Sequence, residues 1–96
     1  MIEVRQTAEF VDWLRRLKDA DAAARIVGRI RRLEQGNFGD ARSVGGRVME
    51  MRVDYGPGYR IYYVRRGAEL AILLCGGDKR SQARDIRRAH KLAEEY

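Results

Sequence analysis

Apolar and polar residues alternate in three segments of the chain, residues 1–7, 47–55 and 59–64. Alternation with a period of two is the pattern of a strand with one buried face. Residues 70–75, LAILLC, are instead apolar at nearly every position, which is typical of a central strand covered on both faces. The short turns GPG and RRGAE separate the last three segments, so we expect these strands to pair and to run antiparallel.

Three further segments, residues 8–18, 21–35 and 80–94, carry apolar residues three and four positions apart, the spacing of one buried helix face. Thr7 stands directly before the first segment and can cap it, and Gly36 follows the second, where glycine often ends a helix. The residues expected on the buried faces are Phe10, Leu14, Leu17, Ile26, Ile30, Leu33, Ile86, Ala89, Leu92 and Ala93.

The order of the predicted elements is β-α-α-β-β-β-α, with a glycine-rich loop over residues 36–46. Strands that follow one another through short turns, with helices before and after them, indicate the α+β class. We therefore expect a single domain over residues 1–96. It should consist of a mostly antiparallel four-stranded sheet, with an N-terminal helical hairpin and a C-terminal helix packed on it.

Composition limits the classes of protein. The 96 residues are 45% hydrophobic, which is enough for one packed core. No apolar run approaches the roughly 20 residues that cross a bilayer, and the first ten residues do not form a secretory signal, so we expect a cytoplasmic protein without membrane contact. Cys75 is the only cysteine, which excludes an internal disulfide and a cysteine-based zinc site. Its apolar surroundings predict a buried thiol.

The chain is strongly basic, with 20 Lys and Arg against 14 Asp and Glu and a net charge of +6. A basic protein favours an anionic partner. Seventeen of the 20 basic residues are arginine, and the planar guanidinium suits phosphate groups and stacked bases. An RNA partner explains this bias, and so does a GC-rich genome, which favours arginine codons.

Alternation places Arg52 and Arg60 at polar positions of neighbouring strands. If the register puts them on one face, their guanidiniums converge across a strand spacing of about 5 Å, beside the hydroxyl of Tyr62. Two such like charges need a neutralising group. Glu50 from inside the protein fits that need, and so does a bound phosphate from outside.

Further basic residues follow the last predicted strand. Lys79 and Arg80 stand where the strand meets the helix, a position that favours anions. One basic row then continues along the last helix and another lies on the second helix: Arg84, Arg87 and Lys91, and Arg25, Arg29 and Arg32. For the second helix we favour a solvated face. For the last helix an anion-binding surface fits equally well, because that row begins where the strand residues point.

Motifs of metal-dependent and nucleotide-binding enzymes are absent: the chain has no GxxxxGK[ST] loop, no HExxH and no acidic pair with metal-ligand spacing. The only histidine, His90, lies deep in the last helix, where we expect a packed or surface residue. Any catalysis must therefore use arginine, lysine, tyrosine or carboxylate groups, without a cofactor. RNA cleavage allows this, because the 2′-hydroxyl of the substrate is the nucleophile and the protein need only orient it and stabilise the charged phosphorane.

Two segments, YGPGYRIYY at residues 55–63 and LLCGGDKRSQARDI at residues 73–86, together resemble the RelE/HigB superfamily of toxin–antitoxin ribonucleases, in its phage-derived Gp49-like branch of addiction-module killer proteins. The likeness covers residues 2–93. It implies a messenger-RNA endonuclease of the bacterial cytoplasm that acts on the ribosome, where the 2′-hydroxyl attacks the adjacent phosphate. It also implies a cognate helix-turn-helix antitoxin, which blocks the toxin and provides its only contact with operator DNA.

The resemblance also assigns roles to residues. Arg60 falls on the strand arginine that contacts the reacting phosphate, and Lys79 or Arg80 falls on the basic residue after the last strand. Where RelE proper has a tyrosine for proton transfer, this chain has Arg84 or Asp85, and it lacks the histidines of the HigB site, so no residue is assigned as general base. The expected catalytic residues are Arg60, Lys79, Arg80 and Arg84. The expected RNA-binding residues are Arg52, Tyr55, Tyr62, Asp78 and Arg87, and no metal ligand is expected.

Two other functions stay open. The missing tyrosine and histidines favour an RNA-binding or ribosome-binding module without cleavage activity. A partner-dependent regulator, which acts in an operon repressor complex, is the second alternative. It predicts tight antitoxin binding and little effect on growth when the protein is expressed alone.

Overall fold

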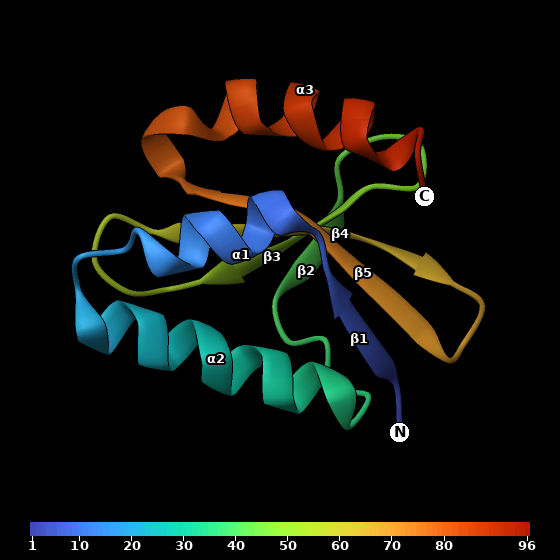
Figure 1. Cartoon of the computed structure of the whole chain (residues 1–96), viewed down its shortest axis with the longest axis horizontal. Helices are drawn as coiled ribbons and strands as arrows, with labels where there is room; N and C mark the ends of the chain where they lie inside the picture. Colours follow the sequence, from blue (N-terminus) through green and yellow to red (C-terminus); the bar gives the residue numbers. More distant parts are fainter.

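The structure, a computed structural model, describes residues 1–96 as three layers, a central β-sheet with α1 and α2 on one face and α3 on the other (Figure 1). The strands are β1 (Glu3–Gln6), β2 (Ala41–Ser43), β3 (Met49–Val53), β4 (Tyr59–Arg66) and β5 (Leu70–Asp78). The helices are α1 (Ala8–Arg15), α2 (Ala20–Glu34) and α3 (Gln82–Ala93), the last preceded by a single 3-10 turn over Lys79–Ser81. None of these helices has the length and apolar character needed to span a membrane.

The sheet has five strands in the order β1-β5-β4-β3-β2. β1 pairs with β5 in parallel, and the other three pairings are antiparallel, which confirms the α+β class and the mostly antiparallel sheet. The prediction of four strands is wrong, because β2 lies within the predicted loop 36–46. This edge strand has three residues and pairs only with β3, so it buries too little surface to leave an apolar pattern in the sequence.

Hydrophobic cores lie on both faces of the sheet. The core under α1 and α2 includes Phe10, Ile26 and Leu33, and the core under α3 includes Leu74 and Leu92. Successive side chains of a strand point to opposite faces, so β4 and β5 contribute to both cores and are buried along most of their length. The prediction that residues 70–75 form a central strand covered on both faces is confirmed.

β5 continues through Gly76 and Gly77, where the sequence predicts its end. Gly77 pairs with Arg60 of β4. Both glycines lie under close contacts, because a Cβ on Gly76 would overlap the indole of Trp13 and a Cβ on Gly77 would overlap the carboxylate of Asp85. Glycine is therefore used here for close packing inside a strand rather than for ending it.

Thr7 fixes the start of α1. Its hydroxyl accepts a hydrogen bond from the Phe10 amide at 3.1 Å and donates one to the Leu74 carbonyl of β5 at 2.6 Å, and the residue is buried. Replacing Thr7 with alanine removes both bonds, so we expect the free energy of unfolding to fall by about 1–2 kcal/mol. Urea denaturation measures this loss. Thr7→Ser keeps the hydroxyl and is the matched control, and equal unfolding midpoints for the two variants would contradict the prediction.

Candidate functional site

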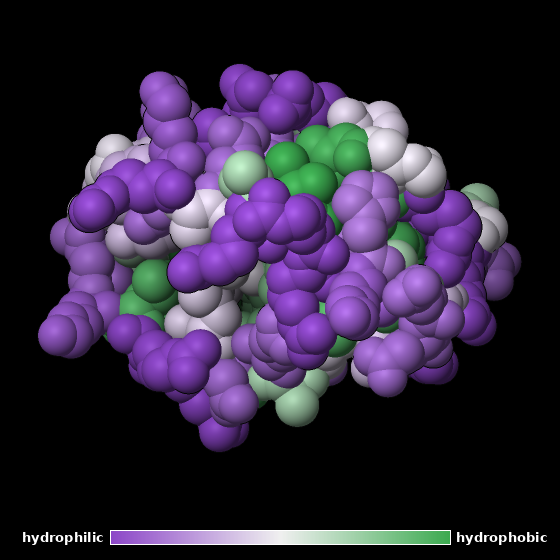
Figure 2. Space-filling model, turned by 90° about the horizontal axis from the view of Figure 1, so that it is seen from above, coloured by the Kyte–Doolittle hydropathy of each residue, from purple (hydrophilic) through white to green (hydrophobic).

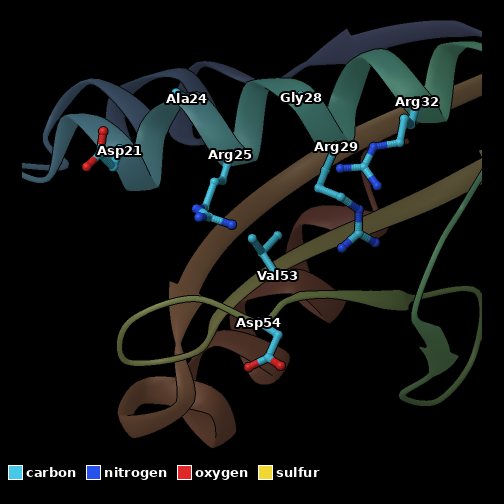
Figure 3. Close-up of a pocket in the computed structure, with 8 residues that line it drawn as sticks. All are labelled: Asp21, Ala24, Arg25, Gly28, Arg29, Arg32, Val53 and Asp54. Carbon is cyan, nitrogen blue, oxygen red and sulfur yellow. The ribbon is translucent and has the colours of Figure 1, made fainter.

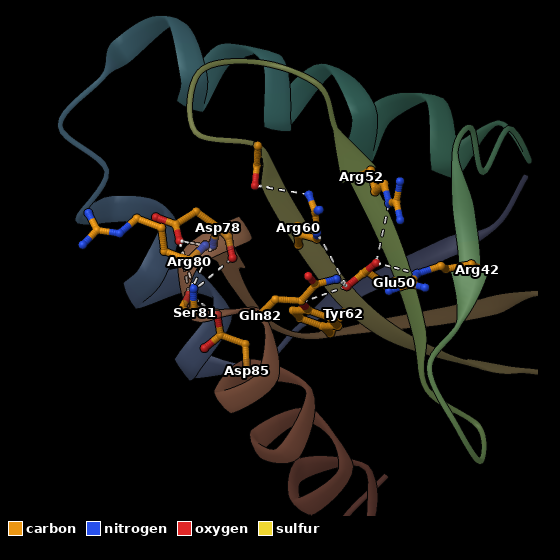
Figure 4. Close-up of polar contacts among 11 residues, drawn as sticks. Arg42, Glu50, Arg52, Arg60, Tyr62, Asp78, Arg80, Ser81, Gln82 and Asp85 are labelled. Carbon is orange, nitrogen blue, oxygen red and sulfur yellow. Dashed lines mark hydrogen bonds and ion pairs between the residues drawn. The ribbon is translucent and has the colours of Figure 1, made fainter.

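A cluster of arginines surrounds one buried glutamate on the α3 face of the sheet (Figure 4). The strand register brings the cluster together: Arg52 lies opposite Arg60 across β3 and β4, and Glu50 lies opposite Tyr62. Arg42 of β2 lies opposite Glu50 on the other side. Residues that are directly opposite point to the same face of a sheet, so Arg52 and Arg60 share one face.

The Glu50 carboxylate is completely buried and is the centre of the cluster. It accepts three hydrogen bonds, from Arg42 Nε at 2.9 Å, the Tyr62 hydroxyl at 3.0 Å and Gln82 Nε2 at 2.8 Å. The Nε atoms of Arg52 and Arg60 each lie 3.7 Å from the same carboxylate. Glu50 thus connects β2, β3 and β4 with the first turn of α3.

The protonation states of the two central groups follow from these contacts. Burial by itself would raise the pKa of Glu50, but the hydrogen bonds from Gln82, Arg42 and Tyr62 outweigh it and hold that pKa below its ordinary value of 4.5. Burial, and then the bond to Glu50, raise the pKa of the Tyr62 phenol far above its ordinary value of 10.0. At neutral pH, Glu50 is therefore an ionised carboxylate with its donors in place, and Tyr62 keeps its proton.

The cluster carries an excess of positive charge. Three guanidiniums share the single negative charge of Glu50, and the buried Nε atoms of Arg52 and Arg60 have no hydrogen-bond partner. The Arg60 side chain is only 10% exposed, and its Nη1 donates to the Gly58 carbonyl at 3.3 Å. Buried guanidiniums with unpaired nitrogens are costly, so a bound anion would stabilise this arrangement.

An open pocket of about 400 Å³ gives access to the cluster. Arg52, Arg60 and Lys79 line it from β3, β4 and the turn after β5, together with the β3–β4 turn. Asp40 and Asp54 also line this pocket. Three cations from three elements thus converge on one space that is open to solvent, an arrangement suited to binding a phosphate group.

The sequence does not decide whether Lys79 or Arg80 is the basic residue beside Arg60, but the turn after β5 directs the two side chains differently. Lys79 lines the pocket of Arg60, whereas Arg80 points away from it (Figure 4). Asp78 shapes this turn, because its carboxylate accepts hydrogen bonds from the amides of Arg80 at 2.9 Å and Ser81 at 3.2 Å. Lys79 is therefore the residue that lies beside Arg60.

A second basic surface lies along the start of α3, where Arg80, Arg84 and Arg87 line a shallow depression of about 550 Å³. The Arg84 side chain is 77% exposed and pairs with its neighbour Asp85 at 3.7 Å. The surface on the α3 side of the molecule is mostly hydrophilic (Figure 2). Two of the predicted catalytic residues, Arg80 and Arg84, therefore lie on this solvated surface and not in the pocket of Arg60.

The two tyrosines expected to bind RNA occupy different environments. Tyr62 has no exposed surface, so it can act only through Glu50. Tyr55 is half-buried, with the Arg25 guanidinium 4.5 Å above its ring and its hydroxyl 3.3 Å from the Asp19 carboxylate. One face of the Tyr55 ring is thus already covered by a cation.

The basic row on α2 borders a hollow of about 670 Å³ beside the end of β3, where Arg25, Arg29 and Arg32 lie in line (Figure 3). Arg29 donates to the Arg52 carbonyl at 2.5 Å and to the Phe38 carbonyl at 3.4 Å, and burial lowers the pKa of its guanidinium. The interpretation of this row as a solvated face is wrong for Arg29, which connects α2 to the strand of Arg52.

The remaining nucleophile and base candidates are packed side chains. Cys75 is buried, and burial raises the pKa of its thiol to about 12. His90 is half-buried, with Nε2 2.9 Å from the Val44 carbonyl in the β2–β3 loop. The prediction of a buried cysteine is confirmed, and of the two environments expected for His90, packed or surface, the structure shows a half-buried one with a contact to the β2–β3 loop.

Arg42 and Gln82 complete the cluster and are absent from the predicted site residues. Arg42 lies in the segment predicted as a loop, and only the pairing of β2 with β3 brings it to Glu50. Gln82 is 32 positions from Glu50 in the sequence, and the 3-10 turn before α3 places it there. A glutamine in the first turn of a helix carries no signal of this contact.

The stability of the fold is expected to depend on the charge of Glu50. A carboxylate whose pKa is lower in the folded chain contributes stability above its unfolded pKa, and that contribution is lost as the pH falls through the folded pKa. Because the folded pKa of Glu50 lies below 4.5, the free energy of unfolding should fall more steeply below pH 4.5 in the wild type than in Glu50→Gln. Urea denaturation from neutral pH to about pH 3 measures this, and parallel curves would contradict the prediction.

One family model and one relative match most of this chain. The family model described as "Phage derived protein Gp49-like" matches residues 12–95. A protein of Haemophilus influenzae strain Rd, described as uncharacterized, is 48% identical over 94 residues, which cover 98% of this chain and 95% of the relative. The match to the model begins within α1 and includes every strand of the sheet except β1.

Proposed function

The chain belongs to the phage-derived Gp49-like family, which is associated with toxin–antitoxin modules, and we propose that it is the toxin of such a module and acts as a ribosome-dependent messenger-RNA endonuclease. The observation that carries this proposal is the pocket in which Arg52, Arg60 and Lys79 converge. Fixed cations at the place where negative charge develops are the main requirement for cleaving a phosphodiester in this way.

In the proposed reaction, the 2′-oxygen of the RNA attacks the neighbouring phosphorus and the bond to the 5′-oxygen breaks. The products are a 2′,3′-cyclic phosphate and a 5′-hydroxyl. Glu50 does not take the proton of the 2′-hydroxyl, because its donors occupy it, and Tyr62 does not, because it keeps its own proton. In this proposal that proton leaves to solvent. The 5′-oxygen takes a proton from solvent.

Arg60 has the central role in this reaction. It is the most buried of the three cations, and its strand β4 lies between β3, which carries Arg52, and β5, which Lys79 follows. Its guanidinium holds the oxygens of the phosphorane, and Arg52 and Lys79 add positive charge. Arg80, Arg84 and Arg87 dock ribosomal RNA from the separate surface on α3. Because each phosphate contact releases counterions, ribosome binding should weaken strongly with salt.

The proposed protein partner is a cognate helix-turn-helix antitoxin, and operator DNA is bound only through it. Family membership supports this partner, since a toxin of such a module is kept inactive by its antitoxin. Co-expression with the antitoxin should restore the growth of cells that produce this protein.

The proposal is tested with purified protein, ribosomes and a translated messenger RNA. We expect new 5′ ends in phase with the reading frame and 2′,3′-cyclic phosphates on the upstream fragments. Cleavage should require ribosomes and should stop when a 2′-deoxynucleotide stands at the cut site. Intact messenger RNA after incubation with folded protein and translating ribosomes would contradict the proposal.

A second candidate function is an RNA-binding or ribosome-binding module without cleavage activity. It is favoured by the state of Glu50 and Tyr62, because neither can accept the proton of the 2′-hydroxyl: Glu50 is occupied by its donors and Tyr62 stays protonated. In that case the ribosome binds the protein and no cut ends appear, and Arg60→Ala weakens binding only. The same experiment separates the two functions.

A further inference from the structure

We propose that Glu50 is the positioning residue of the arginine cluster: it fixes the direction of the guanidiniums and sets the charge of the site, so that the site stabilises a transition state better than it binds RNA. This inference rests on the proposed function, because it concerns the same site. Glu50 itself touches no substrate, since its side chain has no exposed surface. It acts through Arg52 and Arg60.

The contacts of Glu50 set the direction of the arginines. In Arg42, Arg52 and Arg60 alike, the nitrogen that pairs with the carboxylate is Nε, at 2.9, 3.7 and 3.7 Å. Nε is the guanidinium nitrogen next to the side-chain stem, so an ion pair on that side leaves terminal nitrogens for another ligand. In Arg60, Nη1 also donates to the Gly58 carbonyl at 3.3 Å. Arg52 and Arg60 both line the open pocket, and we infer that the charge of Glu50 keeps the Nε side of each guanidinium inward and its terminal nitrogens toward that pocket.

Glu50 is itself held in place by neutral donors. The Tyr62 hydroxyl and the Gln82 amide both donate to Oε2, at 3.0 and 2.8 Å. These donors come from β4 and α3, and they restrict the carboxylate without neutralising it. A polar network in which the central group is satisfied from several rigid elements keeps its geometry. Tyr62 and Gln82 therefore help to orient the arginines indirectly, because they hold the carboxylate that pairs with them.

The charge of the cluster also depends on Glu50. Three guanidiniums and one carboxylate give a net charge of +2. A phosphodiester in RNA carries one negative charge, whereas the phosphorane that forms on attack by the ionised 2′-oxygen carries two. Glu50 therefore lowers the attraction of the cluster for the singly charged phosphodiester, while Arg52, Arg60 and Lys79 remain in the pocket for the doubly charged phosphorane. Only interactions that are stronger in the transition state accelerate a reaction. Removing the carboxylate charge favours binding of RNA and misdirects the arginines.

The test compares Glu50→Gln with Glu69→Gln, which removes the same charge from the exposed β4–β5 turn. Three quantities are measured. The first is the mobility of the Arg52 and Arg60 Nε–H groups, from nitrogen NMR relaxation. The second is the affinity for ribosomes that carry messenger RNA with a 2′-deoxynucleotide at the cut site. The third is the rate at which ribosome-bound protein cleaves messenger RNA. We expect Glu50→Gln to have mobile Nε–H groups, unchanged or tighter affinity and about 100-fold slower cleavage. Glu69→Gln should behave like the wild type.

Each outcome decides the inference. Slower cleavage with retained affinity and mobile Nε–H groups supports it, because a purely structural role would lower affinity and cleavage together as folded protein is lost. Ordered Nε–H groups in a folded Glu50→Gln protein overturn it, whatever the cleavage rate. If the wild type cleaves no RNA, the proposed function fails, and the NMR comparison alone still decides whether Glu50 positions the arginines.

Two further variants keep the test decisive if Glu50→Gln does not fold. Gln82→Ala and Tyr62→Phe each remove one neutral donor to Glu50 and leave every charge in place. We expect each to increase the mobility of the Arg60 Nε–H group and to slow cleavage at constant ribosome affinity. Folded variants with wild-type mobility and wild-type cleavage would overturn the inference.

Discussion

Replacing Arg60 with alanine is expected to lower the rate of RNA cleavage by about 10²–10³-fold, the usual loss when one preorganised donor to a transition-state oxyanion is removed. Arg60 is nine-tenths buried in a pocket wall, so its position is already fixed before RNA binds. The residual positive charge of Arg52 and Lys79 still attracts RNA, and the loss of affinity should therefore be smaller than the loss of rate.

The matched control for this variant is Arg31→Ala, which removes the same charge from an exposed position on α2. Arg60→Lys keeps the charge without the two-pronged fork, and its rate should lie between those of the wild type and Arg60→Ala. Cleavage by ribosome-bound protein gives the rates, and thermal unfolding shows which variants are folded. A folded Arg60→Ala protein that cleaves at the rate of Arg31→Ala would show that Arg60 has no role in cleavage.

Gly76→Ala is expected to lower the free energy of unfolding by about 1–3 kcal/mol, the usual effect of adding a methyl group where no space is left for it. The new methyl group would stand 2.7 Å from the Cδ2 atom of the Trp13 indole. The indole is half-buried, and moving it away from Gly76 would disturb its packing against the rings of Phe10 and Tyr59, with centroids 5.6 and 6.3 Å away. In a domain of this size, each kcal/mol lowers the melting temperature by about 4–8 °C.

Gly28→Ala serves as the opposite control. Gly28 lies in α2, and apart from its chain neighbours and the nearby backbone of the helix, no atom stands within 4 Å of the place where its Cβ would be. Alanine costs less conformational entropy than glycine in a helix, so this variant should gain about 0.5–1 kcal/mol. Calorimetry of both variants tests the packing argument. A Gly76→Ala protein that melts at or above the wild-type temperature would show that β5 and α1 are not in close contact.

Residues within a single element were the predictable part of the site. Alternation along β4 is enough to place Arg60 and Tyr62 on one face, and the apolar run of β5 is enough to identify a central strand. The pairing of Arg52 with Arg60 is different, because register depends on the geometry of the turn over residues 54–58. The local pattern of apolar residues does not determine that geometry.

The unpredicted part of the site depends on contacts between distant segments. β2 is short and polar, so its pairing, and with it the place of Arg42, follows from the edge that β3 leaves open. Gly76 also depends on a distant segment. In the sequence it resembles the end of a strand, but β5 continues through it and the indole of Trp13 packs directly on its backbone. A local pattern does not show which side chain will fill the space above a glycine.

The position of β5 at the middle of the sheet has a consequence for biosynthesis. β5 is the last of the five strands of this sheet in chain order, and it pairs with the first strand, β1, on one edge and with β4 on the other. Until residues 70–78 are available, β1 has no neighbour and β4 lacks one of its two. Such long-range pairing is slow to form, because the closure of a long loop precedes its contacts. A nascent chain therefore lacks the central strand of this sheet, and the partners of β1, until residues 70–78 have left the ribosome.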